Sequence, residues 1–164
     1  MSSRERYEDI PATELGRRVR AGELSAVALH EDFEARLVSA NPGLNALVAD
    51  RLEHASAEAR GIDEAVARGD DVGPLAGVPF TTKEMASAEG LPVTAGSLAR
   101  RGAVAQRDAT YVQRAREAGA VLVGVTNQSE LGLWWESVNP VYGRTRNPYD
   151  HRRTSGGSSG GEGA

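Results

Sequence analysis

The stretch AVLVGVT, residues 120–126, is apolar at nearly every position and rich in β-branched side chains. Such a run is typical of a strand that is buried on both faces of a parallel sheet. The segment before it, ATYVQRAREAG at 109–119, is predicted to be a helix that Asp108 caps and Gly119 ends. A second buried strand is predicted near 76–83, within GPLAGVPFTTKE. Strands that alternate with helices predict an α/β fold, with a largely parallel sheet covered by helices on both faces.

The N-terminal part of the chain has mainly helical patterns. Thr13 is positioned to cap a first short helix, and Ser25 to cap a second helix that the Asn41-Pro42 pair ends. A short strand is predicted at 44–49. The amphipathic pattern at 50–70 predicts a third helix after it.

Composition narrows the classes of function. The 164 residues carry a formal net charge of −4, which gives no electrostatic reason to expect nucleic acid or an anionic membrane as a partner. The absence of cysteine excludes disulfides, thiolate nucleophiles and cysteine-based zinc sites. The longest apolar stretch, at 118–125, is too short to cross a bilayer, and the N-terminus lacks the apolar core of a signal peptide. A cytoplasmic protein is therefore the default expectation.

Beyond Thr126 the pattern becomes irregular, with two Asn-Pro pairs and many glycines. A long irregular segment inside a domain is either functional or disordered. This segment holds Trp134, Trp135, Tyr142 and Tyr149, whereas disordered segments are poor in aromatic residues. We therefore expect it to be ordered and functional.

The Gly/Ser-rich stretch TSGGSSGGEGA, at 154–164, does not fit a phosphate-binding loop, because it contains no lysine. It matches the G-x-S-x-G pattern of a nucleophile elbow, but any Gly/Ser run does so by chance. The three histidines are scattered and lack a second ligand at metal-binding spacing. We expect no metal site, and we expect His30 and His54 to be solvated.

Lys83 is the only lysine of the chain and ends the apolar run AGVPFTTK. In one interpretation it is a strand-end side chain that reaches solvent. In the other it is desolvated, and its pKa is lowered far enough for the neutral amine to accept a proton from a serine. Composition leaves both interpretations open.

Five segments that occur in one order carry a more specific signal. They are GPLAGVPFTTKE at 73–84, TAGS at 94–97, GAVLVGVTNQSEL at 119–131, NPVYGRTRNPYD at 139–150 and SGGSSGGEGA at 155–164. Together they resemble the amidase signature family of serine hydrolases. The resemblance implies a mixed, largely parallel sheet covered by helices. It also implies a mainly helical region at 1–72, followed at 73–164 by the start of the family's α/β core, truncated before its later strands.

The resemblance implies a Ser–Ser–Lys triad in place of Ser–His–Asp. Lys83 matches the family's base, and Ser158 matches the bridging serine, which follows a cis peptide bond from Gly157. Ser159 is expected to hydrogen-bond Lys83 and to hold its amine in place. No cofactor and no metal are implied. The family's nucleophilic serine lies downstream of the last motif, so we expect this chain to be the N-terminal part of a longer protein and to be inactive alone.

By the same resemblance, the activity is hydrolysis of a small-molecule carboxamide through an acyl-enzyme. The stretch at 131–135 would line the acyl pocket, with Leu131, Gly132, Leu133 and Trp135 as candidate residues. Core packing accounts equally well for Leu131 and Leu133.

Two other functions stay open. One is an amidotransferase subunit that releases ammonia from glutamine for aminoacyl-tRNA, which the Trp134-Trp135 pair and Glu162 match less well. The other is a non-catalytic interaction module that keeps the scaffold. The sequence does not specify the amide that is cleaved or the oligomeric state, and it is compatible with a homo-oligomer.

Overall fold

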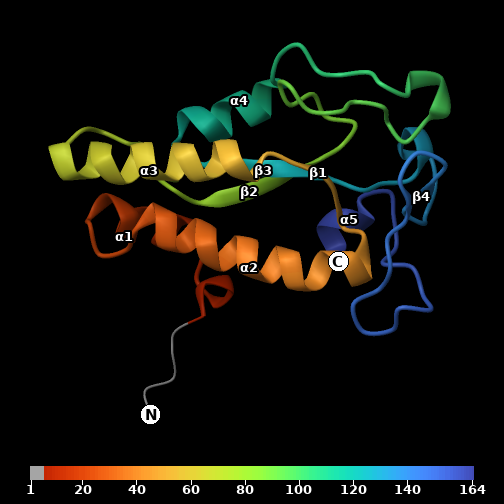
Figure 1. Ribbon diagram of the computed structural model, residues 1–164, viewed down its shortest axis with the longest axis horizontal. Coiled ribbons are helices and arrows are strands. Elements are labelled where there is room, and N and C mark those ends of the chain that lie inside the picture. The colour runs from red at the N-terminus through yellow and green to blue at the C-terminus, as the bar shows by residue number, and fades with distance from the viewer. Residues whose placement is uncertain (1–5) are drawn as a thin grey trace.

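The structure, a computed structural model, describes residues 6–164 (Figure 1). Its helices are α1 (Ala12–Arg20), α2 (Ala26–Leu44), α3 (Leu52–Arg68), α4 (Thr110–Glu117) and the short α5 (Gly160–Gly163). Its strands are β1 (Leu47–Asp50), β2 (Pro79–Lys83), β3 (Val121–Thr126), β4 (Val138–Asn139) and β5 (Gly143–Arg144). Single 3-10 turns are formed by Tyr7–Asp9, Leu98–Arg100 and Glu130–Gly132.

The central sheet has its strands in the order β1-β3-β2. β2 runs parallel to β3, with Lys83 paired to Thr126, whereas β1 runs antiparallel to β3. The sheet is therefore mixed, and the predicted α/β fold is confirmed. β1 comes from the region predicted at 1–72 and β3 from the region predicted at 73–164. The two regions thus share one sheet, and the boundary between them stays a prediction.

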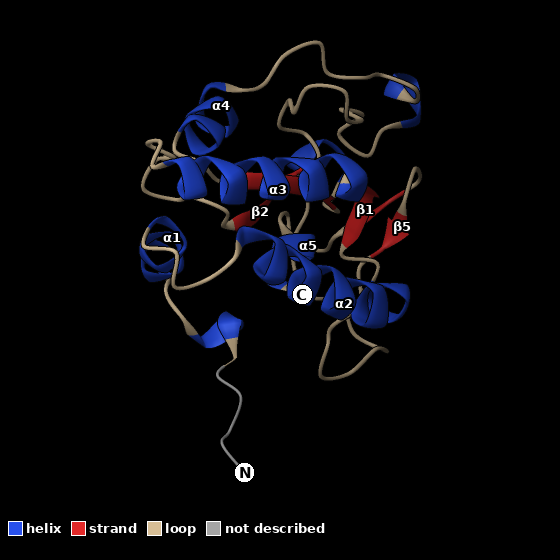
Figure 2. Cartoon of the chain, turned by 60° about the vertical axis from the view of Figure 1, so that its left-hand side comes forward, coloured by secondary structure: helices blue, strands red, loops and turns tan. Residues whose placement is uncertain are grey.

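β3 forms the centre of the core. Every residue of this strand is buried, because β1 and β2 flank it and helices cover both of its faces. Val121 and Val123 pack in a cluster with Ala55 of α3, whereas Leu122 packs in a cluster with Val112 of α4. Figures 1 and 2 show the strands between α4 on one side and α2 on the other.

The first two helices test the predicted capping residues. Ser25 caps α2 as predicted, since its side chain accepts a hydrogen bond of 3.2 Å from the backbone N–H of Ala28. The prediction for Thr13 is wrong, because α1 already begins at Ala12, directly after Pro11. Proline has a fixed φ and no N–H to satisfy, so it suits the start of a helix without a side-chain cap.

Asp108 does not cap α4, although it precedes that helix in the sequence. Its carboxylate accepts a 2.7 Å hydrogen bond from the backbone N–H of Glu89 and pairs with Arg116 at 3.2 Å. The helix begins at Thr110 after Ala109, which makes no side-chain cap. The Asp108 carboxylate therefore binds tertiary partners and not the N-terminus of α4, where the sequence predicts it.

The Asn41-Pro42 pair does not end α2, which continues to Leu44. A proline in the last turn removes one helical hydrogen bond. The helix ends at Asn45 instead, which adopts a left-handed conformation with φ 56°. The Asn41 side chain accepts hydrogen bonds from the backbone N–H groups of Ala46 and Leu47, and so fixes the turn into β1.

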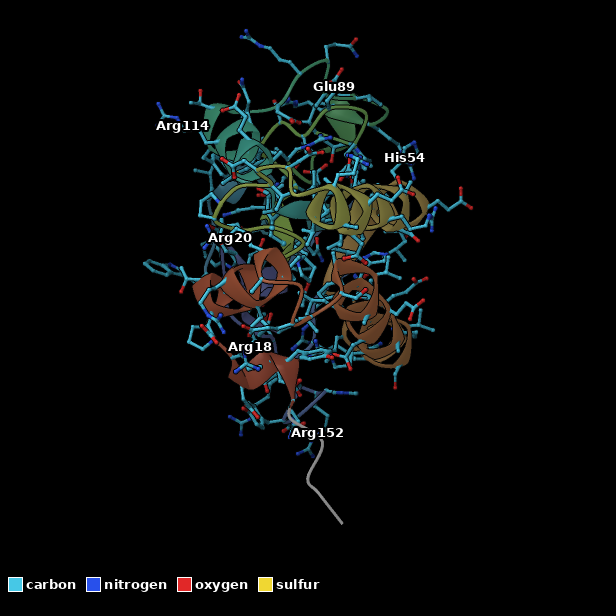
Figure 3. All side chains as sticks on the ribbon, turned by 90° about the vertical axis from the view of Figure 1, so that its left-hand side faces the viewer. Arg18, Arg20, His54, Glu89, Arg114 and Arg152 are labelled. Carbon is cyan, nitrogen blue, oxygen red and sulfur yellow. The ribbon has the colours of Figure 1, made fainter. Side chains whose placement is uncertain are left out.

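The two N-terminal histidines differ from each other. His54 is exposed and points outward in Figure 3, as predicted. The prediction for His30 is wrong, because only 1% of this residue is exposed. α2 packs against α3 and also contributes Leu29 to a cluster with Leu15 of α1. The buried side of α2 is therefore broader than the four-residue spacing of its large apolar residues indicates.

The irregular segment after β3 is folded against the rest of the molecule. β4 and β5 form a small antiparallel sheet. The buried polar residues of the segment include Asn127, Gln128, Ser137, Asn139 and Thr145. The Asn139 side chain donates hydrogen bonds of 2.8 Å to the Asn127 side chain and to the Gln128 carbonyl. Within residues 6–164, no helix is long and apolar enough to cross a membrane.

Candidate active site

Lys83 lies at the C-terminal end of β2, half-buried, with its amine directed at Ser158. Its Nζ donates a hydrogen bond of 2.6 Å to Ser158 Oγ. Burial lowers the pKa of the Lys83 amine below its usual 10.5, and the Glu162 carboxylate acts in the opposite direction. A lowered pKa increases the fraction of neutral amine near pH 7, which is the form that can accept a proton.

Ser158 sits in a loop that is pressed against the rest of the chain. The Gly157–Ser158 peptide bond is cis. The Ser158 carbonyl accepts a 3.2 Å hydrogen bond from the backbone N–H of Ser129. A Cβ on Gly157 would lie 2.8 Å from the backbone nitrogen of Glu136, and one on Gly161 would lie 2.5 Å from the backbone nitrogen of Asn127. These two glycines therefore permit the close backbone approach that places Ser158 at Lys83.

Ser159 does not occupy the position expected for it. Within the described chain its side chain makes no hydrogen bond to Lys83, and the residue is exposed. Ser159 precedes α5, and its backbone carbonyl accepts hydrogen bonds from the N–H groups of Glu162 and Gly163, at 3.1 and 3.2 Å. This helical turn directs the hydroxyl of Ser158 toward the amine and leaves Ser159 at the surface.

Glu162, in α5, lies over the end of the sheet. Its carboxylate accepts one hydrogen bond from Thr81 Oγ1 and another from Thr126 Oγ1, each of 2.9 Å. Thr81 belongs to β2 and Thr126 to β3, so one side chain links the loop of Ser158 to both parallel strands. Sequence reasoning noted Glu162 only as a departure from one subfamily. The available signal was a charged residue four positions after Ser158 in a segment otherwise built of glycine and serine.

A second carboxylate, that of Glu84, is fully buried next to Lys83 in the sequence. It accepts hydrogen bonds from the backbone and side chain of Thr94, both of 2.6 Å, from Tyr142 Oη at 2.7 Å and from Gln128 Nε2 at 3.1 Å. Burial, reinforced by the neighbouring Glu84, raises the pKa of Tyr142 to about 12. The Glu84 cluster, made of Glu84, Thr94, Gln128 and Tyr142, supports the strand end that carries Lys83.

A cavity of about 400 Å³ opens beside Ser158. It is lined by Gly132, Leu133, Trp134, Trp135, Gly157 and Ser158. Three of the four predicted pocket residues therefore face this cavity, and Trp134 joins them. Leu131 is absent from the lining, and its backbone N–H donates a 2.7 Å hydrogen bond to the carbonyl of Ala95.

Core packing does not explain the leucines of this stretch. Leu131 is 46% exposed and Leu133 is 78% exposed, and Trp135 is 81% exposed. Apolar side chains with this degree of exposure contribute little to the stability of a core, and their clustering indicates a binding surface. The assignment of the pocket to an acyl group stays a prediction.

Lys83 and Ser158 are in direct contact at this site. Within residues 6–164, the only hydrogen bond that the Ser158 hydroxyl makes is to Lys83. The Ser137 hydroxyl reaches the Ser158 carbonyl, at 3.4 Å, and not its hydroxyl. A neutral lysine amine at hydrogen-bond distance from a serine hydroxyl can accept a proton from that serine.

Comparison with known proteins identifies the family. The chain belongs to the amidase family, whose model, described as Amidase, matches residues 28–164. Among curated proteins it is 43% identical to fatty-acid amide hydrolase 2-A of Danio rerio and 37% identical to a glutamyl-tRNA(Gln) amidotransferase subunit of Streptomyces coelicolor. Each alignment covers 94% of this chain, but only 30% and 31% of the respective relative.

The solved structures agree with this assignment. A structure titled "Fatty acid amide hydrolase" superposes with a TM-score of 0.88 at 29% identity, over 94% of this chain and 27% of that chain. The predicted amidase-signature fold is thereby confirmed. The chain spans about 30% of the length of the curated relatives that it matches.

Proposed function

We propose that this chain supplies the proton relay of a serine amidohydrolase, which cleaves the C–N bond of a carboxamide through an acyl-enzyme. The observation that carries the proposal is the 2.6 Å hydrogen bond between Lys83 Nζ and Ser158 Oγ. Membership in the amidase family supports the reaction class.

The relay works through neutral Lys83. The amine accepts a proton from Ser158 Oγ while Ser158 accepts one from the attacking serine, whose oxygen forms a bond to the amide carbon. When the C–N bond breaks, the proton returns along the same path to the departing amine. Water then attacks the acyl-enzyme and releases the acid. The lowered pKa of Lys83 favours the first step, because it increases the population of the neutral base.

The attacking serine is a further requirement of this mechanism. No other hydroxyl among the described residues reaches the Ser158 hydroxyl. We therefore propose that these 164 residues alone give no amide turnover. Hydrolysis by the purified chain that a serine-directed inhibitor abolishes would contradict this.

The cavity beside Ser158 supports a substrate whose acyl group is apolar and binds in this cavity. Its lining is dominated by Leu133, Trp134 and Trp135, and apolar surface of this kind binds apolar groups through the hydrophobic effect. The relatives named fatty-acid amide hydrolase are consistent with such a substrate.

A second candidate is a glutamine-dependent amidotransferase subunit. The 37% identity to the Streptomyces coelicolor protein favours it, because this similarity extends over 94% of the chain. The apolar cavity argues against it, since the glutamine side chain is polar and needs hydrogen-bonding partners. A third candidate is an interaction module that keeps the scaffold without catalysis.

A chimera separates these candidates. The chain would replace the matching 30% of the Danio rerio fatty-acid amide hydrolase 2-A, and hydrolysis of a long-chain primary amide, an aryl amide and glutamine would be measured. Lys83→Ala and Ser158→Ala should each reduce kcat by roughly 10³-fold or more. Arg114→Ala, which removes an exposed positive charge on α4, is the matched control and should retain activity. Preference for glutamine would support the amidotransferase, and indifference to Lys83→Ala would support the interaction module.

A further inference from the structure

Glu162 is the one acidic side chain of the signature segment at 155–164, and it makes contacts that no glycine or serine could make. Both of its carboxylate oxygens are used. Oε2 accepts the 2.9 Å hydrogen bond from Thr81, and Oε1 accepts the 2.9 Å hydrogen bond from Thr126. The residue thus connects two adjacent strands through a single side chain.

The positions of the two threonines place this contact at Lys83. Thr81 and Lys83 are two residues apart on β2, so they share one face of the sheet. Thr126 is the residue of β3 that pairs with Lys83 in the parallel register. α5 packs against both strands and lies below β2 in Figure 2. The Glu162 carboxylate therefore lies on the same face as the Lys83 side chain.

We propose that Glu162 is a positioning residue that fixes the segment of Ser158 onto β2 and β3, so that the serine hydroxyl stays on the Lys83 amine, and that it supplies the negative charge facing that amine. This inference rests on the proposed function in assigning Lys83 and Ser158 to the relay. The contacts of Glu162 themselves do not depend on it.

Glu162 differs from the other residues around Lys83 because it brings a negative charge that acts on the pKa of the amine. The segment after Gly156 presents the uncharged Ser158, and β3 presents the uncharged Thr126. On β2 itself the next residue, Glu84, projects to the opposite face by strand alternation, where it is bound by Thr94, Gln128 and Tyr142. Burial lowers the pKa of Lys83, and among residues 6–164 Glu162 is the charged group that raises it.

The two roles of Glu162 can be separated by substitution. Glu162→Gln keeps the size and can still hydrogen-bond both threonines, since its amide has an acceptor and a donor. It removes only the charge. Glu162→Ala removes the charge and both links to the strands. The first variant tests the electrostatic role, and the difference between the two tests the mechanical one.

The single lysine of the chain allows a direct measurement. Protein carrying lysine labelled at the ε carbon gives one side-chain resonance, which Lys83→Arg assigns by its loss. In Glu162→Gln the titration midpoint of this resonance should move to lower pH. Glu64→Gln, which removes the same charge from an exposed position on α3, should leave the midpoint unchanged. A midpoint that does not move in Glu162→Gln overturns the electrostatic role, whatever the outcome for catalysis.

Kinetics in the chimera test the positioning role. Glu162→Gln should shift the acidic limb of the kcat/KM profile to lower pH, because less alkaline solution is then needed to deprotonate Lys83. Glu162→Ala should lower kcat by at least tenfold and leave KM within twofold, since Glu162 does not line the cavity. Equal kcat in Glu162→Ala and wild type overturns the positioning role. Full activity of Lys83→Ala overturns the proposed function instead, and the NMR result would still stand.

Discussion

At the scale of single residues, burial and neighbouring charge act in opposite directions on the pKa of Lys83 but in the same direction on that of Tyr142. Burial lowers the pKa of Lys83, and the Glu162 carboxylate counteracts it. For Tyr142, both burial and the nearby Glu84 carboxylate favour the neutral phenol, so the pKa rises to about 12. Burial therefore shifts both the Lys83 amine and the Tyr142 phenol toward their uncharged forms.

The Tyr142 shift gives a prediction for alkaline solution. The folded pKa is above the usual 10, so the stabilisation from the neutral phenol is fully present below pH 10 and is lost as the pH rises toward about 12. The most alkaline step of the tyrosinate absorbance titration should disappear in Tyr142→Phe. The free energy of unfolding of that variant should also decline less between pH 10 and 12. If the titration curve of Tyr142→Phe equalled that of wild type, the raised pKa would not belong to Tyr142.

Sequence patterns identified the elements whose structure depends on local periodicity. The buried strand at 120–126 was predicted within a few residues from its continuous apolar, β-branched run, and the helix before it was predicted from the pattern at 109–119. Predictions that depended on one polar side chain were less successful. Asp108 and His30 both differ from expectation because tertiary partners, Arg116 for one and the neighbouring helices for the other, override the local preference.

The candidate site was predictable only in part, because its two main residues are 75 positions apart. Composition could not choose between a solvated and a desolvated Lys83. The resemblance to a family was needed to pair it with Ser158. The role of Glu162 was missed, since it depends on the two threonines that the fold brings to its carboxylate.

Two glycine substitutions give a matched pair of predictions at the scale of elements. Gly161→Ala should destabilise the fold by about 2 kcal/mol, because its Cβ would lie 2.5 Å from the backbone of Ala46 and of Asn127. Gly61→Ala in α3 should stabilise it by about 0.5–1 kcal/mol, since nothing lies within 4 Å of the added Cβ and alanine favours the helix.

Urea denaturation at constant m-value measures both free energies of unfolding. The pair also tests the packing of the signature segment independently of catalysis. If Gly161→Ala were as stable as wild type, α5 could not lie as closely against the backbone of Ala46 and Asn127 as the structure indicates.

At the scale of the whole molecule, apolar side chains are unevenly distributed over the surface. Leu133, Trp134 and Trp135 are 78%, 63% and 81% exposed, and they surround the cavity next to Ser158. A cluster of this kind promotes association in water unless a ligand or another part of a protein covers it. The homo-oligomer that the sequence allowed is therefore expected to involve this surface.

Replacement of Leu133 and Trp135 by serine tests this expectation. The double variant should self-associate less in sedimentation experiments and bind less hydrophobic dye. Its free energy of unfolding should change by no more than about 0.5 kcal/mol, because both residues are largely exposed. Tyr149→Ser, at a residue that is 98% exposed and does not line the cavity, is the control. Unchanged association in the double variant would place the contact surface elsewhere.

The order of the central sheet has a consequence for biosynthesis. β1 and β2 are both made before β3, yet neither pairs with the other, because β3 lies between them. While a ribosome adds the residues between Lys83 and Val121, both strands lack their partner for a few seconds at ordinary elongation rates. During that interval the nascent chain exposes two strand edges. Chaperone binding to nascent chains should therefore decline once Thr126 has left the exit tunnel.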